Sequence, residues 1–299
     1  MPSRLAPRAP TYSTFVDLVR ERAAKQPDRL AYAYLLDGEQ DTARLTYADL
    51  DLRVRALAAE LLDRGAERER VLLLLPPGLD YVVAFFGALA AGAVAVPAYP
   101  TRPGRSNRAL DAIIADARAT IAVVKAPLRP HDAVGLGPGI SVVVMDDLDP
   151  KRAGDWKRPR FRRDQLAMLQ YTSGSTATPR GAMMSHEFLV RSSAATKLSI
   201  SSGPEVIGVS WLPLYHDFGL FGTILQPLYA GFPVTMMAPM AFLQRPMRWL
   251  EAISRLGGTV TAAPNFALGY ALGAVCLVVL HCGRRREEPV PGMQPLGKA

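Results

Sequence analysis

YTSGSTATPRG, from Tyr171 to Gly181, is the stretch of this sequence that points most directly to its fold and chemistry. Hydroxyl groups and backbone amides bind phosphate, small residues allow the backbone to approach closely, and a cation such as Arg180 neutralises charge. The apolar run Leu166 to Leu169 precedes the stretch and predicts a strand, and open α/β sheets bind ligands in loops that leave strand ends. Composition alone also allows a solvated turn rich in Ser and Thr.

The stretch is not the P-loop of nucleotide-binding proteins. Begun at Gly174, the P-loop pattern requires a glycine, a lysine and a hydroxyl residue in succession. The chain has Pro179, Arg180 and Gly181 at those places, so all three requirements fail.

Local signals predict the first two helices. Ser13 is expected to cap a helix that ends near Pro27. Thr46 and Asp49 have the spacing of a capping box, and apolar residues then follow at helical spacing as far as Gly65.

Strand and helix patterns alternate along the rest of the chain. The continuous apolar run Val71–Leu75 predicts a strand that is buried on both faces. Further strands are expected at residues 30–36, 93–96, 121–124, 141–145, 166–169, 206–211, 234–237 and 259–263. Further helices are expected at residues 79–91, 107–117, 187–198, 220–229 and 246–256. Repeated units of this length predict an α/β fold, with mostly parallel sheets flanked by helices.

The composition limits the class of protein. The chain has 299 residues, 49% hydrophobic and 21% charged, as in a globular protein with one large domain or two ordinary ones. Its net charge of +8 comes from arginines scattered among acidic residues, so we expect no nucleic-acid partner. The two cysteines, Cys276 and Cys282, argue against a secreted disulfide scaffold.

No targeting or membrane segment is expected. The N-terminal MPSRLAPRAP lacks the apolar core of a signal peptide, and the apolar runs are shorter than the roughly 18–20 residues of a spanning helix. We therefore expect a cytoplasmic enzyme with no transmembrane segment.

A second informative stretch is SWLPLYHDFGLFG, from Ser210 to Gly222. It places Tyr215, His216 and Asp217 side by side just after a predicted strand. The unperturbed pKa of histidine lies near neutrality, so His216 is suited to orienting or transferring a proton. The alternative is a hydrogen-bonded loop, and a metal site is disfavoured because no second His or Cys follows at ligand spacing.

Together the two stretches carry a family resemblance. YTSGSTATPRGAMMSH resembles the phosphate-loop signature of the adenylate-forming superfamily, which contains acyl- and aryl-CoA ligases, luciferases and peptide-synthetase adenylation domains, and SWLPLYHDFGL resembles its next core motif. The chain is most similar to the fatty acyl-AMP ligases, from about Tyr12 to Tyr270. Four longer stretches resemble that branch: GAVAVPAYPTRPGRS (92–106), WLPLYHDFGLFGTILQPLYAGFPV (211–234), APMAFLQRPMRWLEAIS (238–254) and TAAPNFALGY (261–270).

The resemblance implies a reaction. Such enzymes use ATP and Mg²⁺ to convert a long-chain fatty acid into an acyl-adenylate and pyrophosphate. The acyl group then passes to the phosphopantetheine of an acyl carrier protein, often for polyketide or lipopeptide synthesis. A carboxylate oxygen attacks the α-phosphorus directly, so catalysis consists of positioning and charge neutralisation.

The resemblance also implies roles for individual residues. The β and γ phosphates would be held by Thr172, Ser173, Gly174, Ser175, Thr176 and Gly181, with Thr176 near the Mg²⁺. His216 and Arg180 would be catalytic, and Arg180 stands where many members carry lysine, so it keeps the charge with a different geometry. The substrate pocket would be formed by Tyr215, Asp217, Pro264, Asn265 and Phe266.

Other residues are expected to be structural. His186 follows the phosphate stretch and is expected to support the fold. Met236, Met237 and Met240 suit a lipid tunnel, but core packing is the preferred interpretation. Ala177 replaces a glycine common in the superfamily and disfavours positive φ there.

The chain also departs from the family. We find none of the later adenine, ribose and hinge motifs, and no small C-terminal domain with its catalytic lysine. We expect a flexible arm at residues 1–11, a partial adenylation domain at 12–270 and a tail outside the family at 271–299, as after a frameshift or truncation. The ligase activity of this chain is then expected to be impaired. The alternatives are a non-catalytic fragment, a pseudogene product, or one half of a split enzyme.

Overall fold

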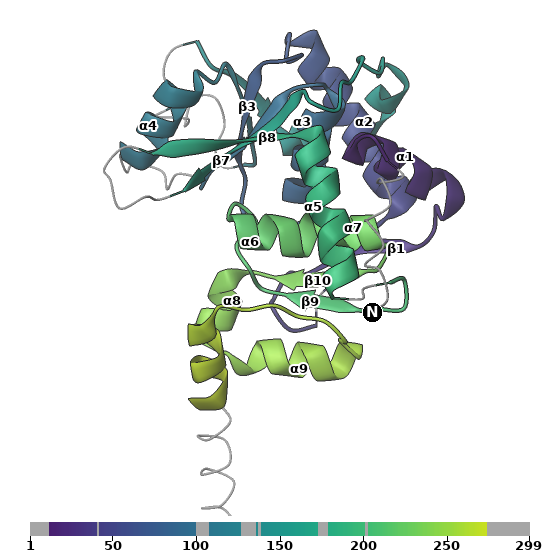
Figure 1. Cartoon of the computed structure of the whole chain (residues 1–299). Helices are drawn as coiled ribbons and strands as arrows, with labels where there is room; N and C mark the ends of the chain where they lie inside the picture. The colour runs from purple at the N-terminus through teal and green to yellow at the C-terminus, as the bar shows by residue number, and fades with distance from the viewer. Residues whose placement is uncertain are drawn as a thin grey trace, which may run out of the picture.

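Two β-sheets share a middle layer of helices (Figure 1). In the computed structural model of the chain, the described residues are 12–40, 42–99, 108–126, 136, 139–172, 179–200 and 203–273. Within these ranges, no helix combines the length and the apolar character that crossing a membrane requires.

The larger sheet has six strands in the order β6-β5-β3-β4-β7-β8. Its strands are β3 (Arg70–Leu74), β4 (Val94–Pro97), β5 (Ile121–Val124), β6 (Ser141–Val144), β7 (Leu166–Thr172) and β8 (Arg180–Ser185). All neighbours are parallel except β7 and β8, which form an antiparallel hairpin. The side chains of Val71 to Leu74 are at most 1% exposed, which confirms the strand predicted to be buried on both faces.

The smaller sheet has four strands in the order β2-β1-β10-β9. Its strands are β1 (Leu30–Leu35), β2 (Thr42–Thr46), β9 (Gly208–Ser210) and β10 (Val234–Met237). β1, β10 and β9 are parallel, and β2 is antiparallel to β1. The prediction of mostly parallel sheets is therefore confirmed, with antiparallel pairing at one edge of each sheet.

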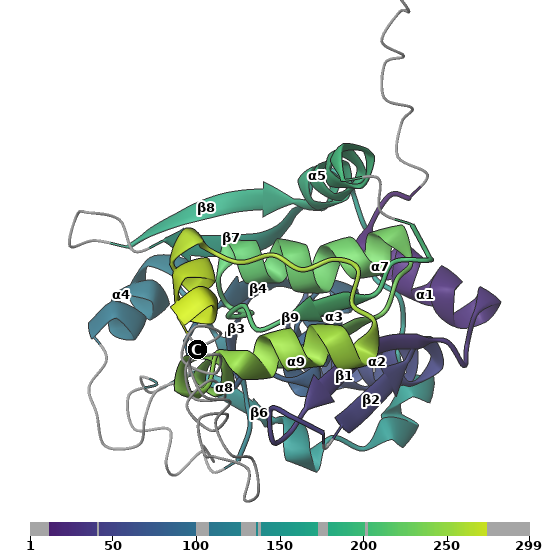
Figure 2. The ribbon, with the colours of Figure 1, turned by 90° about the horizontal axis from the view of Figure 1, so that it is seen from below.

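The helices lie between and outside the sheets. They are α1 (Phe15–Lys25), α2 (Tyr47–Asp63), α3 (Leu79–Ala90), α4 (Arg108–Ala117), α5 (His186–Ser199), α6 (Asp217–Gly219), α7 (Gln226–Ala230), α8 (Pro239–Gln244) and α9 (Met247–Leu256). Shorter helical turns are η1 (Met145–Asp147), η2 (Pro150–Gly154) and the π-helical η3 (Leu220–Leu225). In Figure 1, the continuous segment α6-η3-α7 lies between the two sheets. α4 packs on the other face of the six-stranded sheet, and α9 covers the far face of the four-stranded sheet (Figure 2).

Local signals predicted several boundaries correctly. Thr46 and Asp49 form the expected capping box at the start of α2. The first helix, however, is capped by Thr14 and not by Ser13, because Phe15 is already helical and Thr14 Oγ1 accepts a hydrogen bond from the Asp17 amide at 3.2 Å.

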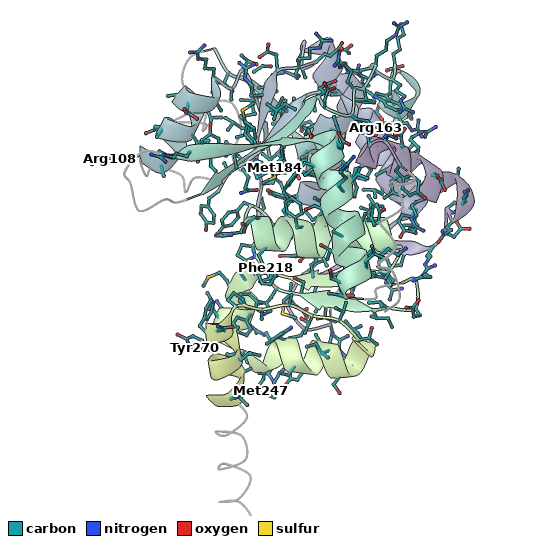
Figure 3. The ribbon with its side chains drawn as sticks, viewed as in Figure 1. Arg108, Arg163, Met184, Phe218, Met247 and Tyr270 are labelled. Carbon is teal, nitrogen blue, oxygen red and sulfur yellow. The ribbon has the colours of Figure 1, made fainter. Side chains whose placement is uncertain are left out.

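The sequence missed the edge strands β2 and β8, the short helix α8 and the helix at residues 265–273. β2, β8 and α8 do not contain the long apolar runs that mark central strands and helices. Met184 of β8, labelled in Figure 3, packs against the core, whereas its neighbour Met183 is 74% exposed. Edge strands of this kind are covered on one side only, so their sequence resembles that of a loop.

Two predicted strands are shorter than expected. Only Gly208–Ser210 of residues 206–211 forms β9. In residues 259–263 only Val260 pairs, through an isolated parallel bridge to Gly208. The chain then enters a helix at 265–273, and the rest of the predicted tail, with both cysteines, lies outside the described residues.

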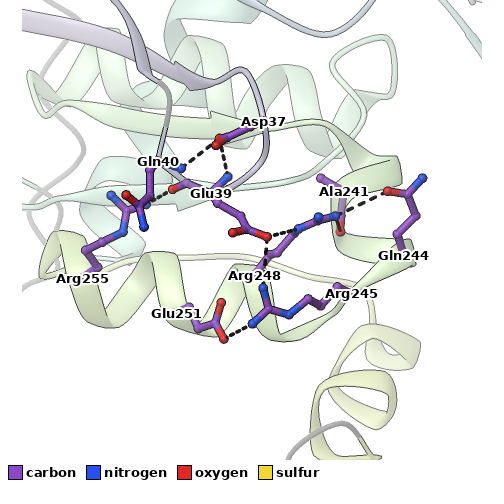
Figure 4. Close-up of polar contacts among 9 residues, drawn as sticks. All are labelled: Asp37, Glu39, Gln40, Ala241, Gln244, Arg245, Arg248, Glu251 and Arg255. Atoms are coloured by element: carbon purple, nitrogen blue, oxygen red, sulfur yellow. Dashed lines mark hydrogen bonds and ion pairs between the residues drawn. The ribbon is translucent and has the colours of Figure 1, made fainter.

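The loop between β1 and β2 is tied to α8 and α9 by a cluster of charges (Figure 4). The Glu39 carboxylate accepts hydrogen bonds from Arg248 Nε and Arg245 Nη1, each at 3.0 Å. Arg255 donates to the backbone carbonyl of Glu39. The hydrogen bond from Arg248 is the main cause that lowers the pKa of Glu39. The cluster therefore joins the beginning of the fold to its last elements.

Gly219 allows the chain to fold back tightly at the start of the α6-η3-α7 segment. A Cβ atom at this position would lie 2.0 Å from the carbonyl oxygen of Pro213, which is backbone and cannot rotate away. A Cβ atom at Gly222, three residues later, would meet nothing within 4 Å.

We predict that Gly219→Ala lowers the free energy of unfolding by roughly 2 kcal/mol or more, because the turn Pro213–His216 must move. Gly222→Ala is the matched control, and we expect its stability to be unchanged or slightly higher. Urea unfolding of both variants measures the difference. Equal stabilities would contradict the close packing at Gly219.

His186, expected to be structural, is 1% exposed at the start of α5. Its ring packs edge-on against Phe161 at 5.6 Å, and neither ring nitrogen has a hydrogen-bond partner among the described residues. Burial lowers the pKa of His186 to about 4, so the ring is neutral in the folded protein at pH 7.

This burial predicts a pH dependence of stability. Below pH 6.5 the unfolded chain protonates His186 while the folded chain does not, so the free energy of unfolding falls as the pH drops from 6.5 towards 4. Between pH 7 and pH 5 the contribution is about 2 kcal/mol. Urea unfolding at pH 7 and at pH 5 measures the change in the free energy of unfolding. We expect this change to be smaller in His186→Leu, by the contribution of the histidine. An unchanged difference would mean that His186 is not buried in its neutral form.

Candidate functional site

The β7–β8 hairpin carries the hydroxyl-rich stretch. Thr172 and Arg180 face each other in the antiparallel register, so residues 173–179 connect the two strand ends. The predicted phosphate contacts Ser173, Gly174, Ser175 and Thr176, and with them the predicted Mg²⁺ contact, lie outside the described residues. Arg180 is exposed at the first position of β8, so a positive charge stands where the strand begins.

The hairpin begins at the carboxyl edge of the six-stranded sheet. β4 and β7 run parallel, with Ala95 beside Met168, so the residues after β4 and at the end of β7 reach the same edge. Tyr99, just after β4, packs edge-on against Tyr215 at 5.1 Å between ring centroids. The structure thus brings the second predicted stretch to this edge.

Gln170, at the end of β7, connects the hydroxyl-rich stretch to the stretch that contains Tyr215 by a hydrogen bond. Its Nε2 donates to the backbone carbonyl of Tyr215 at 3.0 Å, across 45 residues of sequence. Neither Gln170 nor Tyr99 was identified from the sequence. The sequence does contain one indication of a special role for Gln170, because an amide side chain is unusual in a strand that is otherwise mostly apolar.

His216 and Asp217 form an exposed pair at the start of α6. His216 Nδ1 lies 2.9 Å from Asp217 Oδ1, and the same oxygen accepts the Phe218 amide at 2.6 Å. The hydrogen bond from His216 is the main cause that lowers the pKa of Asp217. An ionised carboxylate only accepts, so Nδ1 carries the proton and Nε2 is left for a ligand. The side chains are 62% and 53% exposed, so a ligand can reach them.

Gly181 lies opposite Tyr171 in the hairpin and makes room for its ring. A Cβ atom at Gly181 would lie 2.9 Å from Tyr171 Cζ. The Tyr171 hydroxyl donates to Asp116 of α4 at 2.5 Å, and burial, with this hydrogen bond, raises the pKa of Tyr171. The glycine that the sequence assigned to phosphate binding therefore has a packing reason as well. Asp116 was not identified from the sequence.

An apolar pocket of about 190 Å³ is lined by Phe218, the residue that follows Asp217 in the chain. Phe218 and Gly222 line one wall, and Figure 3 marks Phe218 at the start of its helix. Thr223 and Gln226 of the same helical segment also line it. The remaining lining residues lie at the end of α5, in and after β9, before and in β10, and after α9: Thr196, Ile200, Gly208, Val209, Ser210, Leu212, Phe232, Val234, Val260, Thr261 and Ala262.

Pro264, Asn265 and Phe266 do not line this pocket. They lie at the start of the helix at 265–273, where Pro264 O accepts the Ala267 amide at 3.0 Å. Phe266 is 52% exposed and approaches Trp211 at 6.2 Å. The sequence expected a strand end here, and the pocket is lined instead by the residues just before it.

The three methionines divide between core and surface. Met236 and Met237 are at most 2% exposed, in agreement with core packing. Met240 is 58% exposed on α8, so the expectation of core packing is wrong for this residue. α8 is a short outer helix, and only Ala241 and Phe242 of it are buried.

Comparisons with known proteins identify relatives of this chain. The family described as AMP-binding enzyme matches residues 19–272. The chain is 39% identical over 272 residues to the medium-chain-fatty-acid–acyl-carrier-protein ligase JamA of Moorena producens, covering 88% of this chain and 46% of JamA. It is 37% identical over 271 residues to the long-chain-fatty-acid–AMP ligase FadD26 of Mycobacterium tuberculosis, covering 85% of this chain and 46% of FadD26.

A solved structure is also similar to this chain in sequence and in fold. The fatty acyl-adenylate ligase of L. pneumophila, crystallised with acyl adenylate and pyrophosphate, superposes with a TM-score of 0.80 at 35% identity, covering 86% of this chain and 45% of that one. The chain thus spans slightly less than half the length of these relatives. Because the family match extends over most of its sequence, the chain belongs to the family of AMP-binding enzymes.

Proposed function

We propose that the chain carries the triphosphate-binding and acyl-binding portion of a fatty acyl-AMP ligase. The observation that carries the proposal is the junction at Gln170, which brings the end of the β7–β8 hairpin beside Tyr215 and His216. The apolar pocket is lined by Phe218 and Gly222 of the helical segment that begins just after His216. The names of JamA, FadD26 and the L. pneumophila enzyme all describe fatty-acid ligases, which supports the same reading.

We propose that the pocket binds part of the acyl chain. Phe218, Gly222 and Gln226 recur every fourth residue of the helical segment, so they face the pocket together. The volume of about 190 Å³ is smaller than the roughly 300–1,000 Å³ of whole ligand sites, so we assign to it only part of an acyl chain. The carboxylate of the fatty acid would then lie towards His216, two residues before Phe218 in the chain.

The proposed reaction needs no nucleophile from the protein. A carboxylate oxygen of the fatty acid attacks the α-phosphorus of ATP and forms the acyl-phosphate bond. The bond from that phosphorus to the bridging oxygen breaks, and pyrophosphate leaves with the electron pair. Negative charge accumulates at phosphorus in the transition state, so fixed donors aimed at it accelerate the step.

The chain's own residues would supply those donors. His216, held by Asp217 through Nδ1, would present Nε2 to the reacting oxygens, and Arg180 would neutralise phosphate charge. The hydroxyl-rich residues 172–176 and the Gly181 backbone would hold the β and γ phosphates. Proteins generally hold Mg²⁺ through substrate phosphates and one or two oxygen ligands, and Thr176 offers such a ligand. Bound there, Mg²⁺ would neutralise the leaving pyrophosphate.

The acceptor of the acyl group is part of the proposal. JamA is named for transfer to an acyl carrier protein, and we propose an acceptor of that kind for this chain. We further propose that residues 12–270 form part of an adenylation domain, with residues 1–11 and 271–299 outside it. Reduced turnover relative to the longer relatives is also part of the proposal.

The first test is activity. We expect the purified chain, given ATP, Mg²⁺ and a series of fatty acids, to form acyl-AMP in a fatty-acid-dependent manner, more slowly than full-length JamA assayed beside it. His216→Ala should lower the rate by about 100-fold, as for loss of one transition-state donor. Mass spectrometry detects the acyl-AMP. Fatty-acid binding without any acyl-AMP would favour a non-catalytic fragment, and absence of both would exclude the proposal.

The second test is acyl-chain selection. A Cβ atom at Gly222 meets open space, so Gly222→Leu should fill the pocket without straining the helix. We expect bound fatty acids to shift to shorter chains, and Gly222→Ala to produce a smaller shift. Displacement of a fluorescent fatty acid by acids of increasing length measures it. An unchanged length profile would show that the acyl chain lies elsewhere.

A further inference from the structure

We infer that Gln170 is a positioning residue, which sets the place of the Tyr215–His216 segment relative to the end of β7; this inference rests on the proposed function. The residue acts through the backbone carbonyl of Tyr215. Neither the family match nor the relatives' names assign it a role.

The location of Gln170 is unusual for a polar side chain. It is 3% exposed, in a strand that pairs with neighbours on both sides. Side chains alternate along β7: Leu169 and Tyr171 pack with the α4 side, and Met168 packs with the core on the opposite side. Gln170 shares the face of Met168. Buried strands usually carry aliphatic residues at such positions, so a buried amide is the informative observation.

The amide reaches two backbone carbonyls. Its Nε2 donates to Tyr215 O at 3.0 Å and, more weakly, to Tyr171 O at 3.4 Å. One side chain therefore joins the end of β7 to the segment that carries His216. The segment has a second contact to the same edge in the packing of Tyr215 on Tyr99, but that contact is between side chains and does not fix the backbone.

Stability alone does not explain this arrangement. Gln170 Oε1 is buried and has no hydrogen-bond partner among the described residues. An unpaired buried acceptor destabilises a fold by at least as much as one satisfied hydrogen bond stabilises it. The side chain is therefore close to neutral for folding, or unfavourable. What it provides is a fixed distance between two segments of the site.

A buried phenol lies beside the same segment. Tyr81 is 1% exposed, and its hydroxyl has no partner in the described part of the chain. Burial raises the pKa of Tyr81, and the nearby Tyr215 phenol raises it further. The Tyr215 side chain therefore lies close enough to this buried phenol to affect its pKa.

The test replaces Gln170 by methionine, which has a similar length and no donor. Gln165→Met is the matched control, because Gln165 Nε2 donates in the same way to a backbone carbonyl, that of Gly92 at 3.3 Å, just before β7 begins. We expect Gln170→Met to unfold at the same urea concentration as the wild type or a higher one. A strong loss of stability would overturn the inference, because Gln170 would then be an ordinary structural residue.

Hydrogen exchange tests the positioning without any activity. The amides of Leu212, His216 and Leu220 are bonded within this segment and report on its opening. We expect Gln170→Met to raise exchange in peptides covering residues 211–220 roughly fivefold or more, and Gln165→Met to leave them unchanged. Equal exchange in both variants would overturn the inference, whether or not the chain proves to be a ligase.

Kinetics then test the consequence for the site. In the acyl-AMP assay, we expect Gln170→Met to lower kcat about 10- to 100-fold with a smaller change in the KM for fatty acid, because misplacement affects the transition state more than binding. Gln165→Met should keep the wild-type values. Unchanged kcat in an active chain would overturn the inference. If the wild type forms no acyl-AMP, the catalytic part of the proposed function fails and hydrogen exchange alone decides the role of Gln170.

Discussion

The structure depends on the burial of helix α3. From Tyr81 to Ala90 every residue of this helix is buried, so it is apolar on all sides and needs a cover all round. β1 and β2 contact it from one sheet, β3 and β4 from the other, and α1 and α2 pack beside it. Neither sheet alone would cover it. The two-sheet arrangement follows from this one helix.

The position of the site follows from the strand order. β3, β4 and β7 are parallel neighbours, so the residues after each strand meet at one edge. Open α/β sheets bind ligands at such an edge because loops converge there without interrupting the sheet. The α6-η3-α7 segment then crosses from this edge towards the smaller sheet, and the polar start and apolar wall of the site belong to one continuous element.

The sequence predicted those features that depend on neighbouring residues. The capping box at Thr46 and Asp49 is a contact between residues three apart, and central strands such as β5 and β10 show as apolar runs with the observed boundaries. Edge strand β8 was missed because its exposed face removes that signal. The proximity of Tyr215 to the β7–β8 hairpin was implied only by the family resemblance. The contact of Gln170 with Tyr215 spans 45 residues and has no local pattern.

The pairing of β1 with β10 has a consequence for how the chain is made. Tyr32 pairs with Val234, so the partner leaves the ribosome 202 residues later (234 − 32). At a synthesis rate of about 5–20 residues per second, that edge of β1 stays unpaired for about 10–40 s. β2 covers the opposite edge within the first fifty residues, which leaves one exposed edge and not two. The nascent chain is therefore most vulnerable to mispairing at β1, and a chaperone that binds extended apolar segments would act there first.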